Sequence, residues 1–331
     1  MIKSSAPTRI DLAGGTLDIW PLYLLMGCPP TLNAAINLYA TVEIRPRKDR
    51  RVVVESKDLG LKAEFSSLAA VPERHPLELI LRTVKFYLNK GGISITTHCQ
   101  APQGSGIGGS SALNIALHGA LNEFVKRRYP RSSFIEYAKN IETQVLRVPA
   151  GHQDYFPALY GGVLSLQPGI SGITVKKIKL DLRKLTDRFV LCYTGKPRRS
   201  GINNWQVMKN TLDGDRKVIQ HLNRIGAVAK ETEKALVKGQ VESLADLLTK
   251  EWKVRKALAP GISTPEIDQL ITAAKRKGAL SAKVCGAGGG GCVAFFVKKG
   301  MKPQVSAEIT RLNGRVLDFA FVQRGLQVKS Q

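Results

Sequence analysis

The chain of 331 residues has few cysteines and no long apolar run. Its five cysteines are scattered and form no CxxC pair, and they stand at Cys28, Cys99, Cys192, Cys285 and Cys292. An odd number at such spacing favours neither a disulfide framework nor a zinc site, so we expect free thiols. No apolar stretch reaches the length of a membrane span, and residues 1–15 lack the apolar core of a signal peptide. We therefore expect a cytoplasmic protein without a membrane partner.

Acidic residues are also scarce. The chain has 26 Asp and Glu against 50 Lys and Arg, a net charge of +24. Residues 1–170 hold 19 basic and 13 acidic residues, a net of +6, and the remainder holds 31 and 13, a net of +18. A positive surface attracts anions and speeds encounter with phosphorylated substrates. The basic residues alternate with apolar ones and are not interleaved with aromatics, so we expect a solvated basic surface and no nucleic-acid partner.

Internal repeats and low-complexity segments are absent, and an apolar content of 43% suits one or two globular domains. The apolar patterns predict strands over residues 40–45, 51–55, 93–98, 161–166, 173–179, 189–194 and 293–297. Helical spacing predicts helices over residues 77–88, 133–146, 215–237, 241–258 and 265–277, the second opened by a capping box of Ser133 and Glu136. Without βαβ regularity this mixture predicts an α+β fold. Because the basic surplus begins near residues 180–190, we place a domain boundary there, between residues 1–185 and 186–331.

The segment PQGSGIGGSSA at residues 102–112 carries the strongest functional signal. It contains four glycines and two serines, and an apolar pattern with helical spacing follows from Leu113. A glycine-rich turn before a helix presents several backbone N–H groups and the positive end of the helix dipole to one point. This arrangement predicts a phosphate cradle, although the lysine of a P-loop is missing. The alternative is a serine-capped turn that binds no ligand.

This segment resembles the central ATP-binding motif, PxGxGLGSSA, of the kinases named for galactokinase, homoserine kinase, mevalonate kinase and phosphomevalonate kinase (GHMP kinases). Two further motifs of that family match in the same order, APTRIDLAGGTLD at residues 6–18 and KVCGAGGGGC at residues 283–292. The resemblance extends to the sugar kinase branch with the heptose-7-phosphate kinases. That branch has an E…GxQD segment, matched by Glu142 and residues 151–154, and a TGxxRxS segment, matched by residues 194–200.

The resemblance implies two α+β domains, a GHMP kinase ATP-binding domain over residues 1–185 and a C-terminal GHMP kinase domain over residues 186–331, with the active site in the cleft between them. It implies ATP as the cofactor. The implied nucleotide-binding residues are Pro102, Gly104, Gly106, Ile107, Gly108, Gly109, Ser110, Ser111, Ala112, Gly288 and Gly289. The glycine run at residues 286–291 also suits a simple hinge.

Asp154 is the candidate catalytic base. Phosphoryl transfer to a hydroxyl needs positioning, charge neutralisation and a carboxylate that accepts the hydroxyl proton. Asp154 occupies the aspartate position of the GxQD segment, whereas from position alone a loop aspartate is usually a turn residue or cap. The resemblance also places Arg9 near the reacting oxygen and the base. An arginine there would keep Asp154 ionised and balance developing phosphoryl charge, and the alternative is a surface ion pair.

Glu142 is the candidate magnesium ligand. Within its predicted helix it shares a face with Ile135, Ala138 and Val145. A carboxylate on an apolar face needs a partner, and Mg²⁺ prefers one or two carboxylates with phosphate oxygens and water. The resemblance implies a magnesium-binding glutamate here, with Ser110 or Ser111 sharing the ion. A salt bridge to an arginine is the alternative partner.

Two groups of residues are candidates for binding the acceptor. The resemblance implies that Asp18 binds sugar hydroxyls, with Gly15 and Thr16 in the same loop. This loop departs from the family, since galactokinases carry Glu-His before Thr-Asp and heptose-kinase relatives read GGGTD. Arg198 and Ser200, beside Lys196 and Arg199, follow a strand end and would suit a second phosphate on the acceptor. A charged surface without a ligand is the alternative.

These observations predict an ATP- and Mg²⁺-dependent kinase that phosphorylates a hydroxyl of a sugar or sugar phosphate and resembles heptose-7-phosphate kinases. One alternative keeps the fold and makes the acceptor an isoprenoid-pathway alcohol such as mevalonate. Another is a catalytically silent relative that binds a ligand or nucleic acid through its basic surface. The sequence leaves open the acceptor, the hydroxyl and anomer, a homodimer, and the reason for the charge of +24.

Overall fold

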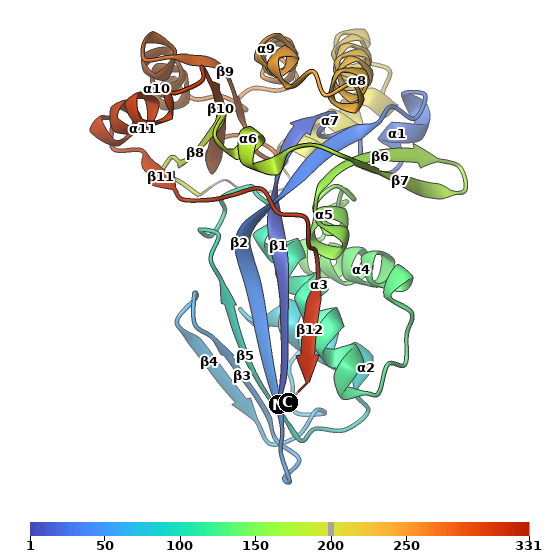
Figure 1. Cartoon of the computed structure of the whole chain (residues 1–331). Helices are drawn as coiled ribbons and strands as arrows, with labels where there is room; N and C mark the ends of the chain where they lie inside the picture. The colour runs from blue at the N-terminus through green and yellow to red at the C-terminus, as the bar shows by residue number, and fades with distance from the viewer. Residues whose placement is uncertain (198–201, 331) are drawn as a thin grey trace.

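The structure is a computed structural model that describes residues 1–197 and 202–330. Its α+β architecture, as expected from the sequence, consists of two sheets and flanking helices (Figure 1). The described strands are β1 (Ile2–Ala13), β2 (Thr31–Pro46), β3 (Val52–Ser56), β4 (Leu61–Phe65), β5 (Ile93–Cys99), β6 (Val163–Gly169), β7 (Gly172–Ile178), β8 (Phe189–Tyr193), β9 (Ala279–Val284), β10 (Cys292–Val297), β11 (Arg315–Leu317) and β12 (Gln327–Ser330). The described α-helices are α1 (Leu22–Leu25), α2 (Glu78–Tyr87), α3 (Gly109–Phe124), α4 (Phe134–Leu146), α5 (Tyr155–Tyr160), α6 (Leu182–Thr186), α7 (Ile202–Leu212), α8 (Arg216–Val237), α9 (Leu244–Arg255), α10 (Pro265–Arg276) and α11 (Lys302–Arg311).

The first sheet has the order β12-β1-β2-β5-β3-β4, and the hairpin β6–β7 joins it through β2. Its described pairs are antiparallel except β3–β5, which is parallel. Strands β1 and β2 are 12 and 16 residues long and run from the lower part of the molecule into the upper part (Figure 1). This length carries the end of β1, with Arg9 and Asp11, to the junction between the two sheets.

Helices α2, α3, α4 and α5 pack together on one face of the first sheet, with α3 against β1 and β2. Helix α3 is buried around most of its circumference because its sequence, GSSALNIALHGALNEF, is apolar or small on nearly every face. Its packing between sheet and helices fixes the position of its N-terminus, which the glycine-rich segment precedes.

The second sheet has the order β11-β8-β10-β9. Strand β10, CVAFFV, is buried at every residue because both faces of the sheet are covered. Helices α9, α10 and α11 pack against this sheet, and α8 packs against α9. Side chains of this sheet, such as Phe189 and Phe296, share a core with Ile10 and Leu12 of β1. The two sheets are therefore joined by apolar packing.

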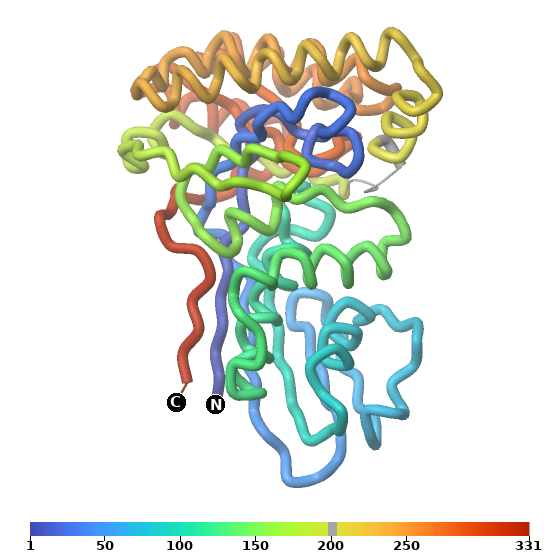
Figure 2. Tube along the Cα trace, turned by 90° about the vertical axis from the view of Figure 1, so that its right-hand side faces the viewer, coloured from blue at the N-terminus to red at the C-terminus, as the bar shows by residue number. Residues whose placement is uncertain are grey.

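The chain ends beside its beginning. Strand β12 pairs with β1, with Ile2 opposite Ser330, and Figure 2 shows the two termini side by side. Residues after the second sheet thus complete the edge of the first. The division into residues 1–185 and 186–331 stays a prediction.

Most predicted elements have structural counterparts, but the capping box does not. Residues Arg131–Ser133 form a turn of 3₁₀-helix before α4, and the Ser133 side chain makes no capping hydrogen bond. Glu136 instead accepts hydrogen bonds from Lys139 and Asn140. Serine at φ −82°, ψ −13° is already helical, whereas a capping residue has extended geometry. No helix among residues 1–197 and 202–330 is long and apolar enough to cross a membrane.

Candidate active site

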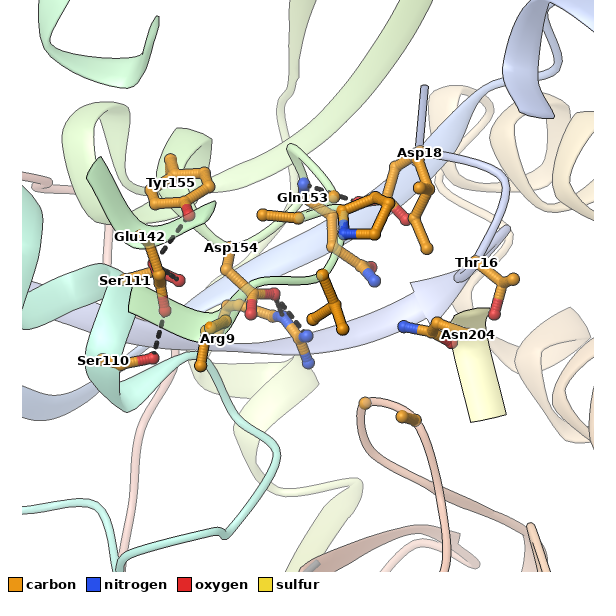
Figure 3. A pocket seen from close by; sticks show the side chains of 18 of the residues that line it. Arg9, Thr16, Asp18, Ser110, Ser111, Glu142, Gln153, Asp154, Tyr155 and Asn204 are labelled. Carbon is orange, nitrogen blue, oxygen red and sulfur yellow. Dashed lines mark hydrogen bonds and ion pairs between the residues drawn. The ribbon is translucent and has the colours of Figure 1, made fainter. Parts of the chain in front are cut away.

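A cavity of about 110 Å³ lies where loops from both sheets meet (Figure 3). Most of its lining belongs to the loop after β1, the start of α3, the end of α4 and the loop that follows α4. The other residues come from β1, α5, α7, α9 and the loop after β9. The lining residues are Arg9, Thr16, Asp18, Ile19, Ser110, Ser111, Glu142, Leu146, Val148, Pro149, Ala150, Gly151, Gln153, Asp154, Tyr155, Asn204, Arg255, Gly286 and Ala287.

The glycine-rich segment forms the turn between β5 and α3. Gly104, Gly106 and Gly108 have φ of +66°, +76° and +78°, which side chains rarely adopt. Gly108 is the N-cap residue of α3. Because glycine has no side chain that could accept from the N–H groups of the first turn, these groups are available to a ligand. A Cβ at Gly108 would lie 3.3 Å from Cγ of Asp154. The segment therefore combines a helix N-terminus with close approach to the candidate base.

The other residues of this segment fix its shape. The carbonyl of Ile107 accepts from the Arg9 N–H at 2.9 Å, and that of Pro102 accepts from the Ser105 N–H at 3.1 Å. Ala112 is fully buried in the core behind α3. Only Ser110 and Ser111 of the segment line the cavity, so the glycines lie beside it.

The second glycine run connects β9 and β10 and touches the first. The N–H of Cys292 donates to the Ser105 carbonyl at 2.7 Å. Gly288 and Gly289 pack against residues 261–262 and do not line the cavity, whereas Gly286 and Ala287 do. The two glycines predicted to bind the nucleotide therefore follow, in the chain, the two residues of this run that line the cavity.

Asp154 lies at the start of α5 and pairs with Arg9. Nε of Arg9 donates to Oδ1 of Asp154 at 2.7 Å, and a second guanidinium nitrogen contacts the same oxygen. Nη1 of Arg9 donates to Oδ1 of Asp11 and to the Gly106 carbonyl, both at 3.1 Å. Burial lowers the pKa of Arg9, but Asp154 and Asp11 outweigh it and raise that pKa, so the guanidinium stays charged.

Behind Arg9 lies a buried network of charges. Nζ of Lys283 lies 2.8 Å from Oδ2 of Asp11 and 2.9 Å from Oε2 of Glu251, and all three side chains are fully buried. Oε1 of Glu251 accepts from the Gly14 N–H at 3.1 Å. Burial raises the pKa of Asp11, but Lys283, Arg9 and Arg255 lower it to about 2.

This network was not predicted from the sequence, although charged residues within the strands indicate it. Asp11 and Lys283 interrupt apolar strands, and a charged residue inside a buried strand needs a partner. Asp11 also follows Arg9 by two positions, which places both on one face of β1.

Glu142 lies opposite Ser110 and Ser111 and is 4% exposed. Its carboxylate accepts from Ser110 Oγ at 2.6 Å, Ser111 Oγ at 3.0 Å and the Tyr155 hydroxyl at 2.6 Å. Its partners are hydroxyls, and not the arginine considered as the alternative. Burial raises the pKa of Glu142 despite the hydrogen bonds from Ser110 and Tyr155. Tyr155 was not among the residues that the sequence motifs pointed to.

Asp18 closes the other side of the cavity. Its Oδ2 accepts from the Gln153 N–H at 3.0 Å, and its Oδ1 is buried without a hydrogen-bond partner in the described parts of the chain. A Cβ on Gly151 would lie 2.0 Å from Oδ2 of Asp18, so this contact requires glycine there. Burial raises the pKa of Asp18, the Gln153 N–H lowers it, and nearby Asp154 raises it further.

The other residues predicted to bind the acceptor differ in where they lie relative to the cavity. Thr16 lines the cavity with a left-handed φ of +79°, and Gly15 lies just outside the lining. Lys196 is exposed, pairs with Glu266 at 2.8 Å and is not one of the residues that line the cavity. Arg198, Arg199 and Ser200 lie outside the described residues.

The cavity has two chemically different sides. In Figure 3, Glu142, Ser110, Ser111 and Tyr155 lie on one side of the Asp154–Arg9 pair, and Asp18, Thr16 and Asn204 lie on the other. One side combines a helix N-terminus with a carboxylate and hydroxyls, a set that suits phosphate and a hard cation. The other offers a carboxylate, a hydroxyl and an amide, which suit a polyhydroxylated molecule.

Comparison with known proteins gives consistent results. The family model for the GHMP kinases N terminal domain matches residues 78–162, and that for the GHMP kinases C terminal matches residues 232–312, together half of the chain. A D-glycero-alpha-D-manno-heptose 7-phosphate kinase of Campylobacter jejuni is 28% identical over 98% of both chains. A mevalonate kinase of Methanothermobacter thermautotrophicus is 25% identical over 88% of both. A solved structure of a D-glycero-D-manno-heptose 1-phosphate kinase from Bacteroides thetaiotaomicron has a TM-score of 0.81 at 26% identity, covering 100% of this chain and 99% of that one.

Proposed function

This chain belongs to the GHMP kinases, and from that premise we propose that it transfers the terminal phosphoryl group of ATP to a hydroxyl of a sugar phosphate. The assignment of the reacting centre rests on one observation. The Asp154–Arg9 pair lies between the α3 N-terminus with Glu142 and the polar side that contains Asp18. A hydroxyl bound on the Asp18 side and a phosphate bound at α3 would meet at this pair.

Asp154 accepts the proton of the attacking hydroxyl in this proposal. Arg9 holds Asp154 in place through its hydrogen bond, and its guanidinium balances negative charge on the transferred phosphoryl group. Because Arg9 also binds Asp11 and the Gly106 carbonyl, its orientation is fixed before substrate arrives. Positioning and electrostatic stabilisation are the main contributions a protein makes to phosphoryl transfer.

The nucleotide phosphates are held by the N–H groups at the start of α3, in the turn formed by Gly104, Gly106 and Gly108. The glycines permit the left-handed turn and keep side chains away from the phosphates. The adjoining glycine run ends at Cys292, whose N–H contacts this turn at the Ser105 carbonyl, and Gly286 and Ala287 of the run line the cavity. Gly288 and Gly289 remain proposed contacts to the nucleotide.

We further propose Mg²⁺ as the second cofactor. The described residues contain no cluster of three His, Cys, Asp or Glu side chains that could hold a metal ion. Mg²⁺ needs no such cluster where phosphate oxygens and water complete its shell. Glu142 with Ser110 and Ser111 offers hard oxygen atoms, and a cation would favour the charged form of a carboxylate that burial penalises. Bound there, Mg²⁺ would neutralise phosphate charge.

Asp18 is the proposed contact to acceptor hydroxyls, because its buried Oδ1 has no hydrogen-bond partner among the described residues. The names of the two heptose-phosphate kinase relatives favour a phosphorylated sugar over mevalonate. Arg198 and Ser200 remain proposed contacts to the acceptor. We also place the protein in the cytoplasm, where ATP is supplied.

ADP release with a panel of acceptors tests the proposal. The panel contains free hexoses and heptoses, their terminal phosphates, and mevalonate, each with ATP and Mg²⁺. We expect turnover with a sugar phosphate, and ³¹P NMR of the product identifies the phosphorylated position. Turnover with mevalonate alone, or with no member of the panel, would contradict the proposal.

A further inference from the structure

Arg255, at the end of α9, is a buried guanidinium without an ion-pair partner among the described residues. It is 2% exposed, and its Nη2 donates to the Gly286 carbonyl at 2.6 Å. Its Nη1 is buried and has no hydrogen-bond partner in the part of the chain that the structure describes. Arg255 also lines the cavity. A fixed, charged donor without an acceptor therefore lies in the wall of the proposed active site.

The nearby carboxylates form no ion pair with Arg255 among the described residues, although its charge helps to lower the pKa of Asp11. The nearby Asp11 carboxylate is held by Arg9 at Oδ1 and by Lys283 at Oδ2. Glu251 is held by Lys283 and the Gly14 N–H. A buried donor left unsatisfied is costly, and a buried charge without a partner is more so. A ligand that brings a negatively charged oxygen would offset both costs.

Arg255 lies next to the loop after β1, which contains the proposed acceptor contacts Gly15 and Thr16. A Cβ built on Gly15 would lie 2.5 Å from Nη1 of Arg255, so glycine at that position makes room for the guanidinium. The next residue, Thr16, lies at the end of the cavity away from Ser110 and Glu142 in Figure 3. Arg255 therefore lies beside the loop of Gly15 and Thr16, which the proposed function assigns to the acceptor.

We propose that Arg255 binds the phosphate already present on the acceptor and selects phosphorylated over unphosphorylated sugars. The inference rests on the proposed sugar-phosphate kinase function. A phosphate supplies the charged oxygen that Nη1 lacks, and guanidinium groups match phosphate geometry. A neutral sugar would bring no charged acceptor to Nη1. Gly286 and Gly15 act as positioning residues, one by accepting from Nη2 and the other by leaving space.

The test compares kcat/KM for a heptose 7-phosphate and for the same unphosphorylated heptose. Arg255→Gln removes the charge, and Lys253→Gln, an exposed lysine on the same helix, is the matched control for the lost charge. One charged hydrogen bond corresponds to about 10- to 100-fold. We expect Arg255→Gln to lower kcat/KM for the sugar phosphate by that factor, to change it less than about threefold for the free sugar, and to leave the KM for ATP unchanged.

A second variant keeps the test decisive if Arg255→Gln does not fold. In Gly15→Ala the new Cβ displaces the guanidinium but leaves its charge, and the same loss of preference for the phosphorylated sugar is expected. An equal loss with both sugars would mean that Arg255 contacts a hydroxyl or only supports the fold, and would overturn the inference. If the wild-type protein phosphorylates no sugar phosphate, the proposed function itself fails. If it does and the variants keep the preference, only the inference fails.

Discussion

Replacing Asp154 by asparagine removes the charge of the proposed base and keeps its shape. General-base assistance contributes about 10²–10⁴-fold to a rate. Proton transfer has advanced little at the loose transition state of phosphoryl transfer, so the loss belongs near the lower end of that range. We expect kcat to fall about 100-fold with both substrates saturating, which is about 3 kcal/mol of barrier.

The contacts of Arg9 show why the variant should still fold. An asparagine Oδ1 can accept from Nε of Arg9 in place of the carboxylate oxygen, which that nitrogen now contacts at 2.7 Å. Arg9 also keeps Asp11 and the Gly106 carbonyl. We therefore expect a loss of about 1–3 kcal/mol in the free energy of unfolding, from the weakened charged hydrogen bond.

The assay measures kcat and both KM values by ADP release, beside a thermal melt. Asp213→Asn is the control, because Asp213 is exposed and its ion pair with Lys209 contributes little. The KM for ATP should change little, since Asp154 is assigned to the acceptor. A folded Asp154→Asn protein that retains more than about half of wild-type kcat would remove Asp154 from the mechanism.

Three other predictions concern the metal, the buried charges and the loop after β1. Glu142→Gln should raise the Mg²⁺ concentration for half-maximal activity about 10- to 100-fold, with kcat partly restored by excess Mg²⁺, and an unchanged Mg²⁺ titration would exclude Glu142 as a ligand. The pKa of Asp11 is lowered from 3.8 to about 2 on folding, so its stabilisation is present above pH 4 and lost as the pH falls toward 2. Acid titration of urea unfolding should show this loss, about 2 kcal/mol, in the wild type and not in Asp11→Asn. Thr16→Gly should raise the free energy of unfolding by about 1 kcal/mol, because a β-branched residue is strained at φ +79°, and a melt showing no gain would refute the strain.

The sequence alone determined the local elements and the motifs. Helices such as α8 and α10 have long amphipathic patterns and Asp or Thr caps, which act within a few residues. The glycines before α3 predicted the turn because their freedom at positive φ is a local property. Short motifs singled out Asp154 and Glu142, whose roles stay predictions. The expected capping box at Ser133 was wrong, because a 3₁₀ turn before α4 had already made that residue helical.

Only the tertiary structure decided which distant residues meet. Arg9 and Asp154 are 145 residues apart, and their contact depends on β1 and the start of α5 reaching the same cavity. Lys283, Glu251 and Asp11 come from β9, α9 and β1, so no local pattern could pair them. The surroundings of Arg255 could not be predicted either, because in the sequence it looks like any other basic residue of an amphipathic helix. Its burial follows from the packing of α9 against β9 and from the absence of a side chain at Gly15, and both are properties of the folded chain.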